Sequence, residues 1–254
     1  MRLQEKVAVI TGACGGIGHA IVSKLVAEGA RVLAADLSQE GLFQLQEEFG
    51  DSVATCIVNV TDYDQVAGMI QQACDHFGRL DIVINNAGIG SAKMLIDHDP
   101  VADFEGVTAV NQKGVYYGIL AAAKKFKQLG TPGVILNTSS VYGKMASEMT
   151  FTYNVSKAAV DMMTKNAALE LAPLNVRVCA IAPGRVDTPL LRQYEALGLW
   201  EHIRREQMRE TFTQPEEIAN VAAFLVSDEA NCINGCTVDA GDGFTNFKYP
   251  LLQR

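Results

Sequence analysis

The chain has 254 residues, is 48% hydrophobic and carries a formal net charge of -8 at pH 7. A chain of this length and apolar content can bury one substantial core, so we expect a single domain spanning residues 1–254. The acidic balance, with Lys and Arg scattered along the chain, argues against nucleic acid or an anionic membrane surface as a partner. A small soluble substrate fits this composition better.

The chain starts MRLQEKVAVITG, with an apolar run too short for a membrane span and no signal-peptide cleavage pattern. The six cysteines show neither zinc-ligand pairs nor the density of a disulfide-stapled secreted domain. We therefore expect reduced core thiols, including Cys232 and Cys236 in a buried segment, no metal site, and a cytoplasmic protein. The four histidines are widely spaced and receive no chemical role.

Short β-branched runs alternate with longer stretches of helical period along the chain. Parallel strands require helical crossovers, and helices on both faces bury such strands on both sides. The alternation therefore predicts the α/β class, as a doubly wound parallel sheet of the Rossmann type with helices on both faces. The expected strands cover residues 7–11, 31–35, 53–58, 81–85, 133–139, 176–182 and 236–240.

One long segment, residues 185–214, interrupts this rhythm after Pro183 and Gly184. It begins at Arg185 and mixes leucines, Tyr194 and Trp200 with four further arginines. A long insertion beside the carboxyl end of a strand is more often a site lid than a linker, so we expect a substrate lid at about 185–214.

A glycine-rich string, TGACGGIG at residues 11–18, joins the first expected strand to a helix. Gly12, Gly16 and Gly18 permit a tight turn and a close backbone approach, so that a pyrophosphate can sit at the start of the helix. An ordinary strand-to-helix turn is the alternative. The strand before the glycines and the helix after them favour a dinucleotide site.

Asp36 follows the second strand, eighteen residues after Gly18. At about this spacing an acidic side chain accepts hydrogen bonds from the adenosine ribose and repels a 2′-phosphate. Neither Cys14 nor Leu37 offers a positive charge for that phosphate, which favours NAD over NADP. A simple helix cap is the alternative role for this carboxylate.

The string NNAG, residues 85–88, ends the fourth expected strand. Asn side chains tie neighbouring backbone groups together, and Ala and Gly leave room for a flat ligand against the main chain. A turn is the alternative reading. Its place at the carboxyl end of a strand favours a ligand contact.

Tyr153 and Lys157 lie four residues apart in YNVSK and share one face of an expected helix. A fixed ammonium nearby, together with the cationic nicotinamide, favours phenolate, which brings a tyrosine towards useful general-base strength. Ser140 ends the fifth strand, where its hydroxyl can hold a substrate oxygen; Ser139 is the competing candidate. A surface Tyr–Lys pair and a strand-capping Ser are the alternative.

The motifs TGACGGIG, NNAG, YNVSK and PGRVDT, with Asn111 and Ser140, together resemble the short-chain dehydrogenase/reductase family over nearly the whole chain. The resemblance implies that Tyr153 is the acid/base and that Lys157 lowers its pKa and binds the nicotinamide ribose. It implies that Ser140 orients the substrate carbonyl and that Asn111 supports a water-mediated proton relay through Lys157.

The same resemblance implies a set of cofactor contacts. Asn59 and Val60 would flank adenine, and Asn86 and Gly88 would line the ribose side. Asn59 stands where the family more often has Asp, but it keeps an acceptor. Val186 and Thr188 would contact the nicotinamide carboxamide. The other expected cofactor contacts are Ile17, Leu37, Ala87, Pro183 and Gly184.

The resemblance further implies a homotetramer that packs the helices carrying Asn111 and Tyr153 against symmetry mates. Residues 158–172, AAVDMMTKNAALELA, are small or apolar on several faces, as in a helix buried on two sides. A helix buried within one subunit is the alternative.

The substrate pocket is expected between residues 141–152 and 185–214. Tyr142, Met145, Met149 and Phe151 are candidates for an apolar wall; Lys144, Glu148 and Arg192 are candidates for contacts with hydroxyl or acidic groups. We predict an NAD-dependent oxidoreductase acting on a secondary alcohol or its ketone, with a polyol, sugar or hydroxysteroid among the candidate substrates. The alternatives are a dinucleotide-binding redox sensor or scaffold with vestigial activity, and an NAD-retaining epimerase or lyase.

Overall fold

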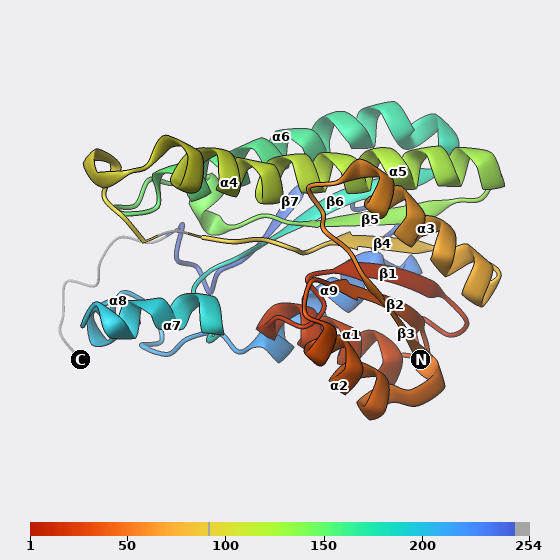
Figure 1. Ribbon diagram of the computed structural model, residues 1–254, viewed down its shortest axis with the longest axis horizontal. Helices are drawn as coiled ribbons and strands as arrows, with labels where there is room; N and C mark the ends of the chain where they lie inside the picture. The colour runs from red at the N-terminus through yellow and green to blue at the C-terminus, as the bar shows by residue number, and fades with distance from the viewer. Residues whose placement is uncertain (91, 247–254) are drawn as a thin grey trace.

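The computed structural model describes residues 1–90 and 92–246, which form one seven-stranded parallel sheet in the order β3-β2-β1-β4-β5-β6-β7 (Figure 1). All the pairings between neighbouring strands are parallel, as the alternating sequence pattern predicts. The strands are β1 Val7–Thr11, β2 Arg31–Asp36, β3 Val53–Ile57, β4 Ile82–Asn85, β5 Gly133–Thr138, β6 Val176–Pro183 and β7 Thr237–Ala240.

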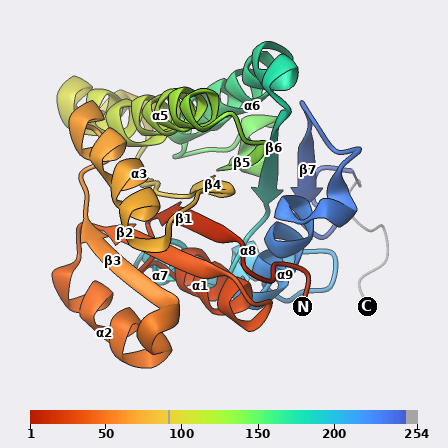
Figure 2. The same cartoon turned by 90° about the vertical axis from the view of Figure 1, so that its right-hand side faces the viewer.

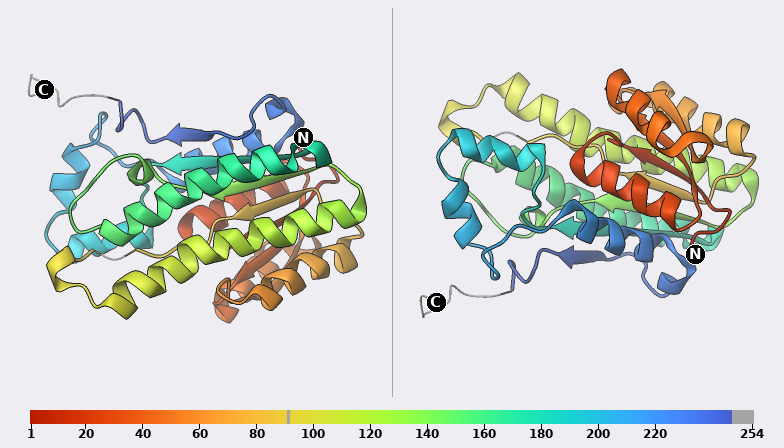
Figure 3. Two further views of the ribbon diagram at one scale, coloured as in Figure 1. Left: turned by 90° about the horizontal axis from the view of Figure 1, so that it is seen from above. Right: turned by 90° about the horizontal axis from the view of Figure 1, so that it is seen from below.

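Helices cover both faces of this sheet (Figure 2). Helices α1, α2 and α9 lie on one face, and α3, α5 and α6 lie on the other. The long helices α5 and α6 run side by side across their face (Figure 3). The helices are α1 Gly16–Ala27, α2 Gln39–Phe49, α3 Tyr63–Phe77, α4 Gly106–Thr108, α5 Gly114–Leu129, α6 Phe151–Leu171, α7 Pro189–Ala196, α8 Trp200–Arg205 and α9 Pro215–Val226.

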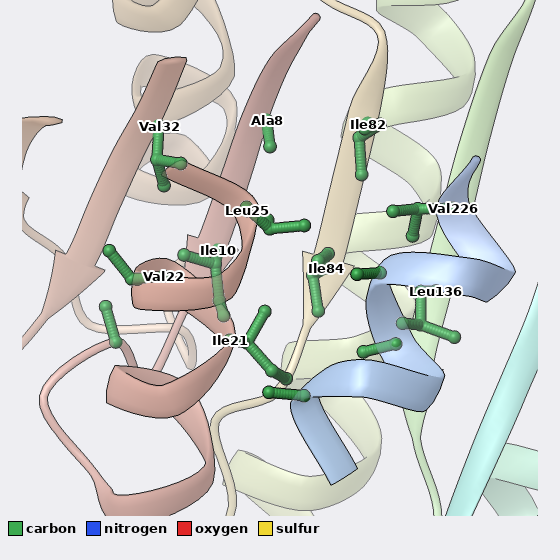
Figure 4. Packing of buried hydrophobic residues seen from close by; sticks show 14 of the residues in the cluster. Ala8, Ile10, Ile21, Val22, Leu25, Val32, Ile82, Ile84, Leu136 and Val226 are labelled. Atoms are coloured by element: carbon green, nitrogen blue, oxygen red, sulfur yellow. The ribbon is translucent and has the colours of Figure 1, made fainter. Parts of the chain in front are cut away.

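Each central strand sends alternate side chains into two cores. In β1, Ala8 and Ile10 join the core under α1 and α9, as Figure 4 shows beside Ile21 and Leu25 of α1. Val9 belongs to the core under α3, α5 and α6. All five residues of β1 are buried, because a strand with helices on both faces has no solvent side. This explains the continuous apolar runs in the sequence.

The parallel register brings the carboxyl ends of the strands to one edge. Strand β1 pairs with β2 on one side and β4 on the other, so the chain order reverses between β1 and β4. Ligands of open α/β sheets bind at such a point, outside the carboxyl ends of the strands. Thr11, Asp36, Asn85 and Thr138 end four of the strands at this edge.

Residues 185–214 form an excursion that contains α7 and α8 at one end of the molecule (Figure 1). A parallel bridge between Val186 and Thr213 closes its base. The interruption expected from the sequence is therefore present, and its action as a lid stays a prediction.

The cysteines differ from the expected pattern. Cys179 is buried in β6, but Cys232 and Cys236 are exposed, so the expectation of a buried segment there was wrong. Both lie near the edge strand β7, which has a neighbour on one side alone and leaves its flanking loop open to solvent.

Metal-binding clusters and membrane-spanning helices are both absent from the described ranges. Within residues 1–90 and 92–246, no cluster of three or more His, Cys, Asp or Glu side chains is arranged to hold a metal ion. In the same part of the chain, every helix is too short or too polar to cross a membrane.

Candidate active site

A cleft of about 660 Å³ opens at the carboxyl edge of the sheet, over the point where the strand order reverses. It draws together residues from the ends of separate strands and from the helices α1, α2, α6 and α7. Fourteen of the site residues expected from the sequence line it: Gly12, Gly16, Ile17, Gly18, Asp36, Leu37, Asn59, Val60, Asn86, Ala87, Gly88, Tyr153, Lys157 and Thr188.

The glycine loop forms one wall of this cleft at a close backbone approach. Gly12 has a φ of +66°, and a Cβ there would lie 2.8 Å from the Cα of Ala87. A Cβ on Gly18 would overlap the carbonyl oxygen of Gly12. Asn86 clamps the loop, because its Nδ2 donates to the carbonyl oxygens of Thr11 at 3.2 Å and Gly12 at 3.1 Å. These two glycines are therefore required by the packing of two chain segments.

Helix α1 begins at this wall without a side-chain cap, because Gly15 occupies the N-cap position. The first N–H groups of a helix have no partner within the helix, and its dipole is positive at this end. An uncapped helix start beside a glycine loop suits the pyrophosphate of a dinucleotide. The residues present thus fit the phosphate part of such a cofactor.

Asp36 lies at the opposite end of the cleft from the catalytic tyrosine expected in α6. Its Oδ1 accepts the backbone N–H of Leu37 at 2.7 Å and of Ser38 at 3.1 Å, and its Oδ2 accepts the N–H of Cys14 at 3.0 Å. A carboxylate offers about four acceptor positions, so capacity remains for a ligand hydroxyl. The helix-cap alternative for Asp36 does not hold, because Ser38 caps α2.

The charges lining the cleft are unevenly placed. Asp36 and Glu40 lie at the end near β2, and Lys157, in α6, is the one cation among the described lining residues. The end near Asp36 therefore carries negative charge without a basic side chain to offset it.

Lys157 is almost fully buried, with 3% of its surface exposed. Its Nζ donates to the carbonyl oxygen of Thr138 at 2.8 Å and lies 5.5 Å from the centre of the Tyr153 ring. Burial lowers the pKa of Lys157 to about 8, although the carboxylate of Asp161 acts in the opposite direction. The shared helical face predicted from the i, i+4 spacing thus brings the two side chains together.

The pKa of Tyr153 lies above its ordinary value, mainly because burial disfavours the phenolate. A hydrogen bond with the Ser140 side chain lowers the pKa but does not outweigh burial. The expected lowering by Lys157 therefore does not arise from the protein groups alone. The physical reason is that a site closed enough to exclude water penalises every charged form.

The two candidate serines have different partners. Ser139 donates from Oγ to the carbonyl oxygen of Lys157 at 3.2 Å, which uses its proton in holding α6 to β5. Ser140 Oγ accepts the N–H of Tyr142 at 3.2 Å and donates to the carbonyl oxygen of Pro183 at a long 3.5 Å, and the Ser140 side chain lies close enough to Tyr153 to lower the pKa of its phenol. The geometry therefore favours Ser140 as the partner of the tyrosine.

Asn111 lies in a π-helical stretch, Ala109–Lys113, between α4 and α5, and is fully buried. Its Nδ2 donates to the carbonyl oxygen of Ile89 at 2.9 Å and to Ser156 Oγ at 3.0 Å, and its Oδ1 accepts the N–H of Ile89 at 2.9 Å. A Cβ on Gly88 would lie 3.4 Å from Lys157 Nζ and 3.5 Å from Asn111 Oδ1. Asn111 Oδ1 and Lys157 Nζ therefore both border the space that Gly88 leaves free by lacking a Cβ, and the water relay stays a prediction.

A second cavity of about 120 Å³ adjoins the first and shares Tyr153, Thr138 and Thr188 with it. Pro183, Gly184 and Val186, expected as cofactor contacts, line this smaller cavity and not the larger cleft. Of the seven expected pocket residues between 142 and 192, Tyr142 lines it; Met145, Met149, Phe151, Lys144, Glu148 and Arg192 are absent from its described wall. The smaller cavity is the candidate substrate pocket.

Sequence reasoning missed several residues at this site. Thr138 contributes the carbonyl that holds Lys157, and Ile89 contributes both backbone groups that hold Asn111. Thr138 lies at the end of the fifth expected strand, and Ile89 follows the fourth. Their places at the carboxyl edge of the sheet could therefore have indicated that they belong to the site. Arg185 lines the smaller cavity from the residue after Gly184, a position that had been assigned to the start of the lid.

Comparisons with known proteins agree with this geometry. Residues 12–245 match a family model described as Enoyl-(Acyl carrier protein) reductase. The 3beta-hydroxysteroid dehydrogenase 2 of Eggerthella lenta is 37% identical over 251 residues, which cover 96% of each chain. The 3-oxoacyl-(acyl-carrier-protein) reductase FabG of Thermotoga maritima is 36% identical over 246 residues, covering 96% of this chain and 99% of the relative. The crystal structure of 3-ketoacyl-(acyl-carrier-protein) reductase from Brucella melitensis complexed with NADH matches at a TM-score of 0.88 and 31% identity, over 96% of this chain and 99% of that one.

Proposed function

This chain belongs to the short-chain dehydrogenase/reductase family, and from that premise we propose how its residues carry out the reaction. The protein is an oxidoreductase that interconverts a secondary alcohol and its ketone. The family binds a nicotinamide dinucleotide, which supplies or accepts the hydride. The cleft of about 660 Å³, the uncapped start of α1 and the acceptor at Asp36 fit that cofactor.

In this proposal Tyr153 transfers the proton to and from the substrate oxygen at its phenolic Oη. Ser140 donates a hydrogen bond to the same oxygen, which stabilises the negative charge that develops there. The observation that carries this assignment is the position of Tyr153, which shares the wall of the smaller cavity with Ser140 and lines both cavities. A group in that place can reach a substrate and a cofactor together.

Lys157 acts on the phenol through its charge. Its ammonium lies over the tyrosine ring and is fixed by the carbonyl of Thr138, so a phenolate formed at Tyr153 meets a cation at constant distance. The same ammonium is placed to bind the nicotinamide ribose. Asn111 holds the Ile89 backbone and, through Ser156, the first turns of α6, and is proposed to support a water relay from Lys157.

We propose NAD as the preferred cofactor. The carboxylate of Asp36 has free acceptor capacity for a ribose diol, and Glu40 adds a second negative charge nearby. A 2′-phosphate placed there meets two carboxylates, whereas Lys157, the one basic side chain among the described lining residues, lies in α6 beside Tyr153.

We propose residues 185–214 as the substrate lid. Thr188, Leu190, Leu191 and Tyr194 from this segment line the smaller cavity. A Cβ on Gly16 would lie 3.0 Å from Thr188 Cγ2, so the segment also packs against the glycine loop. Movement of this segment would therefore open both cavities at once. A polyol, a sugar and a hydroxysteroid remain the candidate substrates.

We propose a homotetramer, as the exposed face of α6 supports. Phe151, Val155, Met162 and Leu169 are exposed and recur at spacings of four and seven, which places them on one stripe of the helix. Tyr116 of α5 is also exposed, on the helix that runs beside α6. We further propose the cytoplasm as its location, because all six cysteines are free thiols.

The acid/base role of Tyr153 is tested by the Tyr153→Phe variant, assayed with NAD and a broad panel of secondary alcohols by NADH absorbance. We expect kcat to fall by roughly 10²–10⁴-fold, with the Kd for NADH unchanged within a few-fold, because the substitution removes a single hydroxyl. Tyr116→Phe, which removes a hydroxyl from an exposed tyrosine on α5, is the matched control. Undiminished turnover in Tyr153→Phe would contradict the acid/base role of Tyr153. NADH binding by the wild type with no turnover of any alcohol or ketone would favour the redox-sensor alternative.

A further inference from the structure

One charged side chain on the wall of the smaller cavity has no part in the proposed proton transfer. Arg185 follows β6 at its carboxyl end and is 8% exposed. It is the one formally charged residue among the described residues that line this cavity. Burial of a guanidinium is rare without a specific reason.

The position of Arg185 is fixed from both ends. Its carbonyl accepts the N–H of Thr213 at 3.1 Å, which ties the start of the 185–214 segment to its end. A Cβ on the preceding Gly184 would lie 2.8 Å from the Cα of Gly241, so the chain packs backbone to backbone there. The side chain therefore starts from an immobile point.

Aromatic rings surround the guanidinium. Its central carbon lies 5.6 Å from the ring centre of Tyr142, 5.6 Å from that of Tyr194 and 5.9 Å from that of Phe244. Tyr142 and Tyr194 line the smaller cavity with it. These rings exclude water and hold the planar group in one orientation.

The hydrogen-bond capacity of this guanidinium is only partly used. One terminal nitrogen donates to the carboxylate of Glu206 at 2.9 Å. The Nε–H is buried and has no acceptor among the described residues. A buried donor without a partner costs free energy, which a ligand acceptor would recover.

From these contacts we propose that Arg185 determines specificity by binding a second oxygen of the substrate, remote from the carbon that loses or gains the hydride. This inference rests on the proposed function, since it deepens the assignment of the smaller cavity as the substrate pocket. The Arg185–Glu206 pair is neutral as a whole. A carboxylate on the substrate would leave a net negative charge in a pocket walled by aromatic and aliphatic groups, whereas a neutral oxygen would not.

The substrate class is therefore a diol or hydroxyketone, in which one oxygen meets Ser140 and Tyr153 and the other accepts from Arg185. A simple secondary alcohol fills the same cavity but leaves the Nε–H unpaired. Sites built to hydrogen-bond a substrate oxygen reject analogues that lack it, because their own polar group then stays buried without a partner.

The test compares cyclohexanol, the 1,2-, 1,3- and 1,4-cyclohexanediols and a hydroxycyclohexanecarboxylate as substrates with NAD. We expect the best diol to exceed cyclohexanol in kcat/KM by roughly ten- to a hundredfold, as for one hydrogen bond to a charged donor. In Arg185→Met this ratio should fall to within about threefold of unity, because the donor to the second oxygen is gone. Equal use of diol and cyclohexanol by the wild type, or preference for the carboxylate, would overturn the proposal.

Two further variants guard this test. Arg185→Met removes the guanidinium that pairs with the Glu206 carboxylate, so the double variant Arg185→Met/Glu206→Gln removes both charges together. Arg192→Met is the matched control, since Arg192 lies in the same segment but is exposed and does not line the cavity. The control should keep the wild-type preference, and a diol preference that survives in the double variant would refute the role of Arg185.

A binding measurement separates this inference from the proposed function. Calorimetry of each diol into the protein saturated with NADH reports binding without turnover. Absence of NADH binding marks failure of the proposed function, and the diols are then titrated into the protein alone. In either case, diol binding that Arg185→Met weakens at least tenfold supports the proposal, and binding that it leaves unchanged, or no binding at all, overturns it.

Discussion

Replacing Asp36 by Asn tests the cofactor end of the site with a minimal change of shape. The carboxylate accepts three backbone N–H groups, from Cys14, Leu37 and Ser38. Asn keeps the side-chain size and one acceptor oxygen, but it loses the charge and one of the two acceptors. The bonds from Leu37 and Ser38 can remain on the amide oxygen, whereas the amide NH2 cannot accept from Cys14, so that bond is lost together with the proposed contact with the ribose.

Two effects set the magnitude. A hydrogen bond from a ribose hydroxyl to a carboxylate contributes ~1.5–3 kcal/mol, so its loss should lower kcat/KM with NAD by about ten- to a hundredfold. Two unit charges ~4 Å apart interact with ~4 kcal/mol at an effective dielectric of about 20, and salt reduces this. Removal of the repulsion should therefore raise kcat/KM with NADP by about tenfold or more. Together these two effects should lower the ratio of kcat/KM for NAD to kcat/KM for NADP by at least about a hundredfold.

The assay measures kcat/KM for NAD and NADP with one alcohol at fixed ionic strength, in wild type, Asp36→Asn and a control. Glu40→Gln is the control, because it removes a neighbouring negative charge from the same wall without touching the Cys14, Leu37 and Ser38 bonds. It should narrow the preference by less than the Asp36 variant does. A wild type that prefers NADP, or an unchanged ratio in a folded Asp36→Asn, would refute this account of the carboxylate.

Two predictions concern stability and assembly. Burial lowers the pKa of Lys157 from 10.5 to about 8. Above pH 8 the folded protein therefore loses this proton, whereas the unfolded chain keeps it up to about pH 10.5. The free energy of unfolding accordingly rises with pH between these two values. Lys157→Met should therefore be inactive but more stable than wild type by about 2 kcal/mol at pH 7, after about 1 kcal/mol is deducted for the lost bond to Thr138. Chemical denaturation should show that this gain in the free energy of unfolding vanishes by pH 10.5. A gain that stays constant with pH would contradict burial of the lysine charge as its cause. Light scattering at micromolar concentration should give four times the 27.4 kDa chain mass, and Leu169→Glu, at a residue 78% exposed, should lower that mass; a wild-type monomer would rule out the tetramer.

The sequence by itself determined the sheet and the order of its elements. Continuous apolar runs such as that of β1 require helices on both faces, and all seven expected strands are present. Spacing along the sequence also predicted which site residues lie together when they belong to one helix or one loop. Tyr153 and Lys157 meet because a helix brings residues four apart onto one face, and Gly12 and Gly18 lie where the backbone must pass close to its neighbours.

Only the tertiary structure distinguished between neighbouring residues that the sequence offered for the same role. Ser139 and Ser140 are equivalent in sequence, but Ser139 donates to the backbone of α6, whereas the Ser140 side chain lowers the pKa of the Tyr153 phenol. Burial is likewise a property of the whole fold, and it raises the pKa of Tyr153, an effect that the spacing of Tyr153 and Lys157 in the sequence could not show. Exposure at the sheet edge similarly overturned the buried positions expected for Cys232 and Cys236.

Arg185 shows the same limit most clearly. In sequence it is one of several arginines after a strand. Its ion pair is twenty-one residues away, and its aromatic neighbours come from segments before and after it in the chain. Sequence patterns report neighbours within a few residues, whereas the chemistry of a pocket depends on side chains that long-range folding brings together. The reaction type was thus legible from local spacing, and the features that select a substrate became visible only in the folded chain.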